Sequence, residues 1–208
     1  MSRQDDERYM RRALAAARAT LGRTWPNPAV GCVVVKDGVV LAETATAPGG
    51  RPHAEEQALA LAGEAARGAT VYITLEPCGQ RSNGGPSCSH RLSEAGVARV
   101  VIAADNPEPL SAGRGMVHLE DEGVPSERGF LAEEAEPIYR GFRHRLRTGR
   151  PLVEAAASGE GFDGAFALGP GESPEAALDR LGREGYGRVW APPDSELAAR
   201  LKVLGLLS

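Results

Sequence analysis

Residues 69–78 read ATVYITLEPC, and this stretch decides the fold class of the 208-residue chain. Its first seven residues, 69–75, form a nearly unbroken apolar and β-branched run, which predicts a buried strand. Apolar residues at helical spacing predict a helix upstream at 53–63, and VARVVIA predicts a second buried strand downstream at 97–103. A short helix is predicted between the two strands, at 87–96. Strands that alternate with helices are typical of a layered α/β sheet.

Farther toward the N-terminus, the sequence predicts a hairpin that makes this sheet mixed. Residues 29–36 are another apolar run, Asp37-Gly38 is a hairpin turn signal, and 39–43 returns as the next strand. Apolar periodicity and helix-start charges predict further helices, which span 5–21, 116–122 and 133–147. We therefore expect a three-layer α/β/α fold with a mixed central sheet.

The composition changes after Pro151, where a long segment rich in small residues begins. The remaining pattern predicts only three elements, a helix at 174–185, a strand at 187–191 and a helix at 195–204. We expect these to be too few to bury a separate core. The sequence thus predicts a main domain over 1–147 and a short C-terminal tail over 148–208, which packs on the main domain or on a partner subunit.

Charge and hydropathy exclude several classes of protein. The chain has 28 acidic and 24 basic residues and a formal net charge of -4, which argues against a generally basic nucleic-acid coat. No apolar run approaches 18 residues, so no membrane span is expected, and the charged start MSRQDDERYM shows no secretory signal. Three cysteines, an odd number, favour a reduced, cytoplasmic setting over a disulfide framework.

Three potential metal ligands stand at the ends of predicted strands and helices. His53 stands at a helix start, Cys78 follows the strand 69–75, and Cys88 lies at the start of the next predicted helix. Imidazole and thiolate are ligands that Zn²⁺ prefers, and three protein ligands leave one tetrahedral position open, as in catalytic zinc sites. Zinc lowers the pKa of a bound water, and Glu55, two residues after His53, is suited to move protons rather than to bind the metal.

Two other residues have simpler interpretations. A closed structural zinc site would need a fourth ligand, and His90 is the nearby candidate. Cys32 lies inside the apolar run VGCVVV, where we expect it to act as a small buried hydrophobic residue.

The order HxE, PC and second Cys resembles that of the zinc-dependent nucleoside and nucleobase deaminases. Nine residues, GQRSNGGPS, separate Cys78 from Cys88, and this longer loop is similar to that of the pyrimidine deaminases of riboflavin biosynthesis. Further matching stretches are PNPAVGCVVVKDG at 26–38, RPHAE at 51–55, GATVYITLEPC at 68–78, AGVARVVIAADNPEP at 95–109 and RTGRPLV at 147–153. The resemblance implies a cytidine-deaminase-like fold, one zinc ion per chain, and hydrolytic deamination of a phosphoribosylated 2,5-diaminopyrimidinone.

Four residues are candidates for substrate binding. The resemblance implies that Asn27, held between two prolines, contacts the substrate; an Asx-turn role is the alternative. Arg81, with Ser82 and Asn83, is expected to hold the substrate phosphate, because arginine makes bidentate contacts with phosphate; a solvated loop charge is the alternative. Glu76 is expected to hydrogen-bond a ligand or the backbone beside the metal ligands.

The chain departs from the family at two places. The loop usually carries a histidine two residues after the first zinc cysteine and is one residue shorter, whereas Gln80 stands at that position here. A reductase half follows the deaminase half in the bifunctional members, but here only about 55 residues follow RTGRP. GFDGAFALGPGES at 161–173 resembles the start of that half, so 148–208 is interpreted as a reductase-domain remnant, and neither NADPH binding nor reductase activity is expected.

Other functions remain open from the residues alone. A basic cluster near the end of the main domain is compatible with a tRNA adenosine deaminase, although it is also typical of a solvated helix face; its members are Arg140, Arg143, Arg145, Arg147 and Arg150. A free nucleobase or nucleoside deaminase and a non-catalytic zinc-stabilised binding module are further alternatives. The favoured interpretation predicts a phosphorylated small-molecule substrate, no nucleic-acid or membrane partner, and a homo-oligomer, most simply a dimer.

Overall fold

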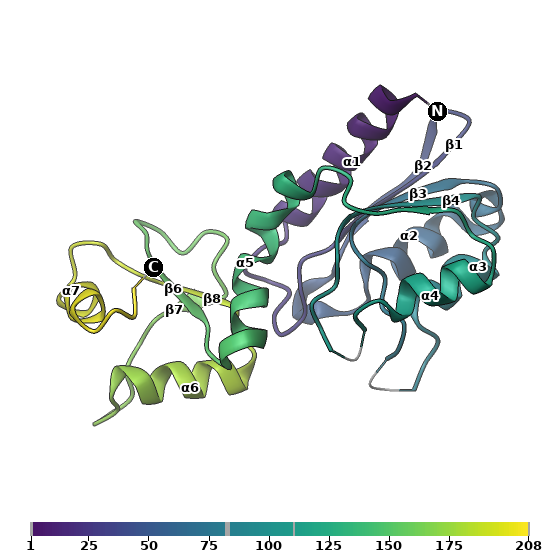
Figure 1. Cartoon of the computed structure of the whole chain (residues 1–208). Coiled ribbons are helices and arrows are strands. Elements are labelled where there is room, and N and C mark those ends of the chain that lie inside the picture. The colour runs from purple at the N-terminus through teal and green to yellow at the C-terminus, as the bar shows by residue number, and fades with distance from the viewer. Residues whose placement is uncertain (1, 82–83, 110, 208) are drawn as a thin grey trace. The chain divides into compact units, whose positions relative to one another are not determined.

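The computed structural model describes residues 2–81, 84–109 and 111–207 (Figure 1). Its internal contacts divide the chain into two compact units, each made of segments that are separate in sequence. The first unit consists of Met1–Ala19, Val30–Ala47 and Pro52–Pro137. The second unit consists of Thr20–Ala29, Pro48–Arg51 and Ile138–Ser208.

The first unit is built on a five-stranded sheet with the strand order β2-β1-β3-β4-β5. Strand β1 pairs antiparallel with β2 and β3, while β3, β4 and β5 run parallel, so the predicted mixed sheet is confirmed. Every residue of β3 is buried, as expected for a central strand covered on both faces. The strands are β1 (Gly31–Lys36), β2 (Val39–Ala45), β3 (Thr70–Leu75), β4 (Arg99–Ala104) and β5 (Ser126–Glu127). The two-residue β5 carries too little pattern for the sequence to predict it.

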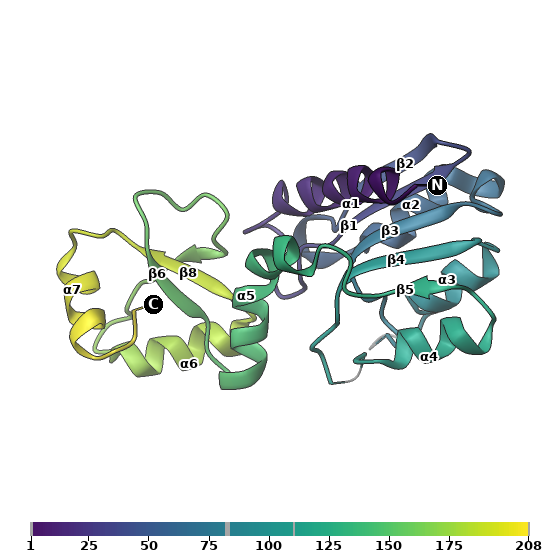
Figure 2. The same cartoon turned by 45° about the horizontal axis from the view of Figure 1, so that its top comes forward.

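Helices cover both faces of this sheet and give the expected three layers. Helix α1 lies on one face, and α2, α3 and α4 lie on the other (Figures 1 and 2). Their bounds are α1 (Arg3–Arg18), α2 (Ala54–Ala62), α3 (Cys88–Glu94) and α4 (Arg114–Asp121), with short 3-10 turns at Pro48–Gly50 and Gly63–Ala66. Helix α1 begins two residues earlier than the predicted start, because Ser2 and Asp5 form a capping box.

Helix α1 approaches β1 so closely that the contact requires a glycine. A Cβ added at Gly31 would stand 1.9 Å from the carbonyl oxygen of Ala13, a backbone atom that cannot move independently. The Gly31 N–H also donates to the buried Thr74 hydroxyl at 2.9 Å, which fixes the strand position. The backbone of β1 therefore packs directly against the helix.

This contact predicts a large stability loss for Gly31→Ala. Overpacking against fixed backbone is expected to lower the free energy of unfolding by about 2–3 kcal/mol, measured by urea denaturation. Gly169→Ala is a matched control, since the nearest atom to its added Cβ belongs to the flexible Glu172 side chain, at 3.2 Å. Equal unfolding midpoints for Gly31→Ala and the unchanged protein would contradict the close contact.

The C-terminal segment carries a sheet of its own. Helix α5 (Ala132–Thr148) leads into β6 (Leu152–Ala155), β7 (Gly164–Ala165), α6 (Pro174–Glu184), β8 (Arg188–Ala191) and α7 (Glu196–Val203). The three strands are parallel, in the order β6-β8-β7. The sequence predicted α6, β8 and α7 but not β6 or β7.

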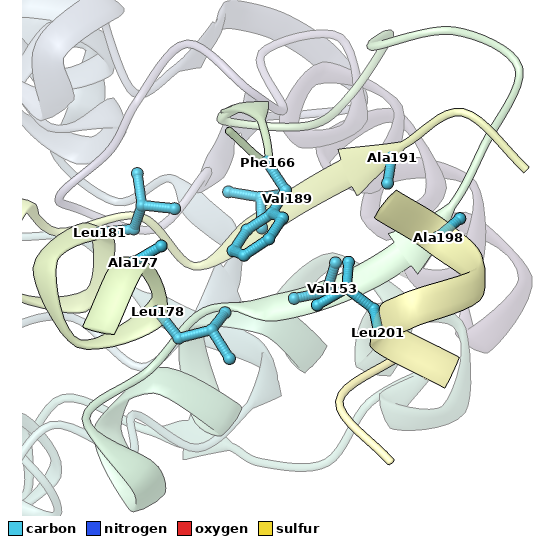
Figure 3. Close-up of a cluster of buried hydrophobic side chains, with 9 residues drawn as sticks. All are labelled: Val153, Phe166, Ala177, Leu178, Leu181, Val189, Ala191, Ala198 and Leu201. Carbon is cyan, nitrogen blue, oxygen red and sulfur yellow. The ribbon is translucent and has the colours of Figure 1, made fainter. Parts of the chain in front are cut away.

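The expectation that 148–208 is too short to bury a core of its own is wrong. Side chains from the strands and from both helices meet in one buried cluster (Figure 3). Its members are Val153, Phe166, Ala177, Leu178, Leu181, Val189, Ala191, Ala198 and Leu201. The missed strands explain the error, since β6 and the residues around β7 supply Val153 and Phe166 to the cluster.

No helix among the described residues is both long enough and apolar enough to cross a bilayer. The predicted cytoplasmic setting stays a prediction.

Candidate zinc centre and active site

Three potential metal ligands from separate parts of the first unit meet at one point. The ligand atoms of His53, Cys78 and Cys88 all lie within 4.8 Å of one another. His53 Nδ1 stands 3.9 Å from Cys78 Sγ and 3.4 Å from Cys88 Sγ. With Zn–S near 2.3 Å and Zn–N near 2.0–2.1 Å, tetrahedral geometry places nitrogen and sulfur about 3.5 Å apart. The three side chains therefore have the chemistry and the spacing that a zinc ion needs.

The local folding of each segment explains this meeting. His53 is the N-cap residue of α2, Cys78 follows the end of β3, and Cys88 is the first residue of α3. The backbone N–H of Cys88 donates to Cys78 Sγ at 3.3 Å. A helix start presents free N–H groups and a partial positive charge, and both stabilise a thiolate placed there.

The thiols of Cys78 and Cys88 shift each other's pKa in opposite directions. A hydrogen bond from Cys88 lowers the pKa of the Cys78 thiol to about 4, with His53 acting in the same direction. The same contact, together with burial, raises the pKa of Cys88. These shifts favour the thiolate form of Cys78, and a bound cation would favour release of the Cys88 proton.

Glu55 lies beside the potential metal ligands but is not one of the three residues whose ligand atoms come together. Its side chain is buried, at 3% exposed, in the first turn of α2. Burial raises the pKa of Glu55 above its usual value, while the nearby His53 opposes this shift. A carboxyl whose pKa moves toward neutrality is suited to accept and return a proton.

The structure also separates the ligands from the other two candidates. The ring of His90 stacks on His118 with centroids 4.1 Å apart, and His90 is exposed outside the ligand group. Among the described residues the group has three members, so the arrangement favours an open site over a closed structural one. Cys32 is fully buried in β1, which confirms its interpretation as a core residue.

Glu76 directly follows β3 and stands two positions before Cys78. Its carboxylate Oε2 accepts the backbone N–H of Asn106 at 3.3 Å, and Asn106 Nδ2 donates to the Glu76 carbonyl at 3.4 Å. Burial raises the pKa of this carboxyl. These hydrogen bonds join the segment that follows β3 to the segment that follows β4. They therefore help to fix the backbone just before Cys78.

The candidate substrate residues fall in different parts of the structure. Asn27 belongs to the second unit, where its side-chain amide donates to the carbonyl oxygen of Gly50 at 2.9 Å. Ser82 and Asn83 lie outside the described residues. Gln80, at the position of the family histidine, accepts a hydrogen bond from Arg114 at 3.0 Å. Their predicted roles in substrate binding stay predictions.

Arg81 lies close to the metal ligands, with its side chain 5% exposed. One guanidinium nitrogen donates to Glu56 Oε2 at 2.9 Å and to Cys88 Sγ at 3.6 Å. Glu56 is a residue beside the ligands that the sequence does not predict. The sequence places Glu56 directly after Glu55, near the start of a predicted helix. It does not indicate that Glu56 pairs with Arg81, which lies 25 positions away.

The basic cluster of the second unit is partly neutralised by acids of the same unit. Arg140 pairs with Glu154 at 2.6 Å, and Arg150 pairs with Asp179 at 2.6 Å. These pairs lower the positive charge that a nucleic acid would meet on this segment.

Comparisons with known proteins agree with the geometry. The family described as "Cytidine and deoxycytidylate deaminase zinc-binding region" matches residues 3–104. The diaminohydroxyphosphoribosylamino-pyrimidine deaminase of Buchnera aphidicola is 39% identical over 143 residues, which cover 69% of this chain and 97% of that protein. This chain belongs to the pyrimidine deaminase family of riboflavin biosynthesis. Membership in this zinc-binding deaminase family supports zinc as the ion for His53, Cys78 and Cys88.

Longer members of the deaminase family are also similar to the chain. Riboflavin biosynthesis protein RibD of Escherichia coli is 46% identical over 179 residues, which cover 84% of this chain and 48% of that protein. A solved structure of Acinetobacter baumannii RibD superimposes with a TM-score of 0.69 at 40% identity, covering 83% of this chain and 48% of that one. The chain thus spans about half the length of these relatives, and the match confirms the expected cytidine-deaminase-like fold.

Proposed function

We propose that this chain is a zinc-dependent hydrolytic deaminase of a phosphoribosylated 2,5-diaminopyrimidinone in riboflavin biosynthesis. The observation that carries the proposal is the joint placement of His53, Cys78 and Cys88 beside the buried carboxyl of Glu55. This arrangement supplies a metal position and a proton carrier at one point. The name of the Buchnera aphidicola relative, of which the chain covers 97%, supports the choice of substrate.

The proposed reaction replaces a ring amino group by an oxygen atom from water and releases ammonia. When bound, zinc polarises a water molecule so that it can attack the ring carbon. The Glu55 carboxylate accepts a proton from the water and delivers it to the ring nitrogen. It then carries a proton to the departing amine, which leaves as ammonia. His53 and the two cysteines hold the metal at this carboxylate, and burial raises the pKa of Glu55, which favours a group that both accepts and returns a proton.

We further propose that residues 1–147 form the deaminase domain and that 148–208 is a reductase-domain remnant. The alignment with the Escherichia coli relative covers 84% of the chain and so extends past residue 147, which supports a relation between the last segment and that longer protein. A homo-oligomer, most simply a dimer, is part of the same proposal. Asn27 is proposed to contact the pyrimidine, and Ser82 and Asn83 to contact the phosphate.

The function is tested by ammonia release from a panel of substrates given to the zinc-loaded protein. The panel contains the 2,5-diaminopyrimidinone ribosyl-phosphate, its dephosphorylated form, cytidine, guanine and an adenosine-bearing tRNA. We expect turnover of the phosphorylated pyrimidine and a kcat/KM at least about 100-fold lower without the phosphate, since charge-assisted contacts of about 1.5–3 kcal/mol each are lost.

Other outcomes of this assay would replace the proposal. Preferred turnover of the tRNA, with binding that weakens steeply as salt rises, would favour the tRNA adenosine deaminase. Preferred turnover of cytidine or guanine would favour a nucleoside or nucleobase deaminase. Zinc binding without ammonia release from any member of the panel would favour the non-catalytic binding module.

A further inference from the structure

Arg81 is the buried cation nearest to the metal ligands among the described side-chain contacts. It lies three residues after Cys78, in the loop between the two ligand cysteines, yet its side chain is 5% exposed. Its guanidinium nitrogen stands 3.6 Å from Cys88 Sγ, within hydrogen-bonding range of a sulfur. A charged donor is therefore aimed at one of the three ligand atoms.

An acidic residue of α2 holds this guanidinium in place. Glu56 Oε2 accepts from Arg81 at 2.9 Å, and its other oxygen, Oε1, pairs with Arg91 of α3 at 3.3 Å. Glu56 is 27% exposed, so the pair is sheltered from solvent on the Arg81 side. Glu56 also follows Glu55 directly, which ties the orientation of Arg81 to the first turn of the helix that His53 caps.

A hydrogen-bond donor at this position changes how much electron density the Cys88 sulfur donates to a bound metal. A hydrogen bond to a metal-bound thiolate withdraws electron density from the sulfur, which leaves the metal more electron-poor. A cation at this distance also offsets part of the negative charge of two thiolates and the nearby Glu55. Residues that hold metal ligands in this way commonly change metal affinity or activity by 10- to 100-fold when they are replaced.

We propose that Arg81 is a positioning residue of the zinc centre, which orients the Cys88 thiolate and sets its donor strength, with Glu56 as its anchor. This replaces the phosphate contact expected for Arg81 from the sequence, because the guanidinium faces Glu56 and Cys88. The proposal rests on the zinc site of the proposed function, and it does not depend on which substrate is deaminated.

The test measures metal binding directly, by chelator competition with Zn²⁺ and by the sulfur-to-metal charge-transfer band of the Co²⁺-substituted protein. Arg81→Met removes the charge and the donor while keeping a similar length. We expect zinc to bind about 10- to 100-fold more weakly, because Arg81 no longer orients the Cys88 thiolate toward the metal. We also expect the Co²⁺ band to move to lower energy, because the sulfur that loses its hydrogen bond becomes a stronger electron donor. Arg81→Lys keeps a positive charge but loses the planar, forked guanidinium group. Its zinc affinity should therefore fall between that of the unchanged protein and that of Arg81→Met.

Arg91→Met is the matched control. Arg91 pairs with the same Glu56 but has no described contact with a ligand sulfur, and its side chain is 33% exposed. Its replacement should change zinc affinity by less than about 3-fold and leave the Co²⁺ band in place, since a partly exposed ion pair with no described contact to a ligand sulfur contributes little. If Arg81→Met does not fold, as judged by circular dichroism, Arg81→Lys alone decides, with a weakened zinc affinity and a shifted band expected.

Unchanged zinc affinity together with an unchanged Co²⁺ band in the Arg81 variants would overturn the proposal. A phosphate role would then show in kinetics, as a raised KM for the phosphorylated substrate with kcat preserved. The proposal predicts the opposite pattern. The kcat of the zinc-saturated Arg81→Met protein should be lowered, and its KM should change by less than about 3-fold. Failure of the deaminase assay leaves the metal measurements intact, so the two proposals can fail separately.

Discussion

Glu55→Gln is expected to keep its zinc and to lose nearly all turnover, with kcat lowered about 10³- to 10⁴-fold, at the upper end of what general acid–base catalysis supplies. The reason is that a single buried carboxyl serves each proton transfer of the proposed reaction. Glutamine has nearly the same shape and can fill the same buried space, but it cannot accept and return a proton. The measurement is ammonia release at saturating substrate, with zinc per chain determined on the same sample.

The matched control for this variant is Glu64→Gln, because Glu64 is an exposed glutamate just beyond the end of α2. It should retain wild-type kcat and zinc content. A Glu55→Gln protein with near-normal kcat would remove Glu55 from the mechanism. A Glu55→Gln protein that loses its zinc would instead mean that the carboxylate helps to hold the metal.

Cys88→Ser is expected to lose most of its zinc. The variant removes one of three ligand atoms that stand within 4.8 Å of one another, and a neutral hydroxyl is a poor substitute for a thiolate. We expect zinc content to fall from about one per chain to a small fraction after dialysis against a mild chelator, with affinity lowered by more than about 100-fold, beyond the effect of replacing an outer residue. Elemental analysis of the dialysed protein gives the result.

His90→Ala is the control for this experiment, since His90 lies two residues from Cys88 but stacks on His118 outside the ligand group. It should keep its zinc under the same dialysis. If His90→Ala loses as much zinc as Cys88→Ser, the site is closed and structural, and the open coordination position that the mechanism needs does not exist.

The fold of the first unit was predictable because its strongest signals are local. The apolar runs at β1, β3 and β4 are long enough to identify as buried strands, and the Asp37-Gly38 turn identifies the hairpin. The short strands β5 and β7 have two residues each, which is too few to show an alternation of apolar and polar residues or a strand propensity. The core of 148–208 was missed because its sheet depends on the two-residue β7 and on β6, which was not predicted either.

The proposed zinc ligands were predictable because the chemistry of zinc binding admits few residue types. Few residue types bind zinc, and His53, Cys78 and Cys88 each stand at the end of a strand or the start of a helix. The environment of Arg81 was not predictable, because a loop arginine is compatible with many partners. Its burial against Glu56 and Cys88 depends on how α2 and the loop meet in space, and no sequence spacing encodes that contact.

The most direct test of the proposed deamination is one turnover experiment in water enriched in oxygen-18, with the zinc-loaded protein and the 2,5-diaminopyrimidinone ribosyl-phosphate. Mass spectrometry of the product and an ammonia assay are read on the same sample, beside the Cys88→Ser and Glu55→Gln variants. We predict that each product molecule carries one oxygen from the solvent in place of an amino group, that ammonia forms in equal amount, and that both signals vanish in the two variants. An unchanged substrate, or product formation that persists without Cys88 and Glu55, would contradict the account.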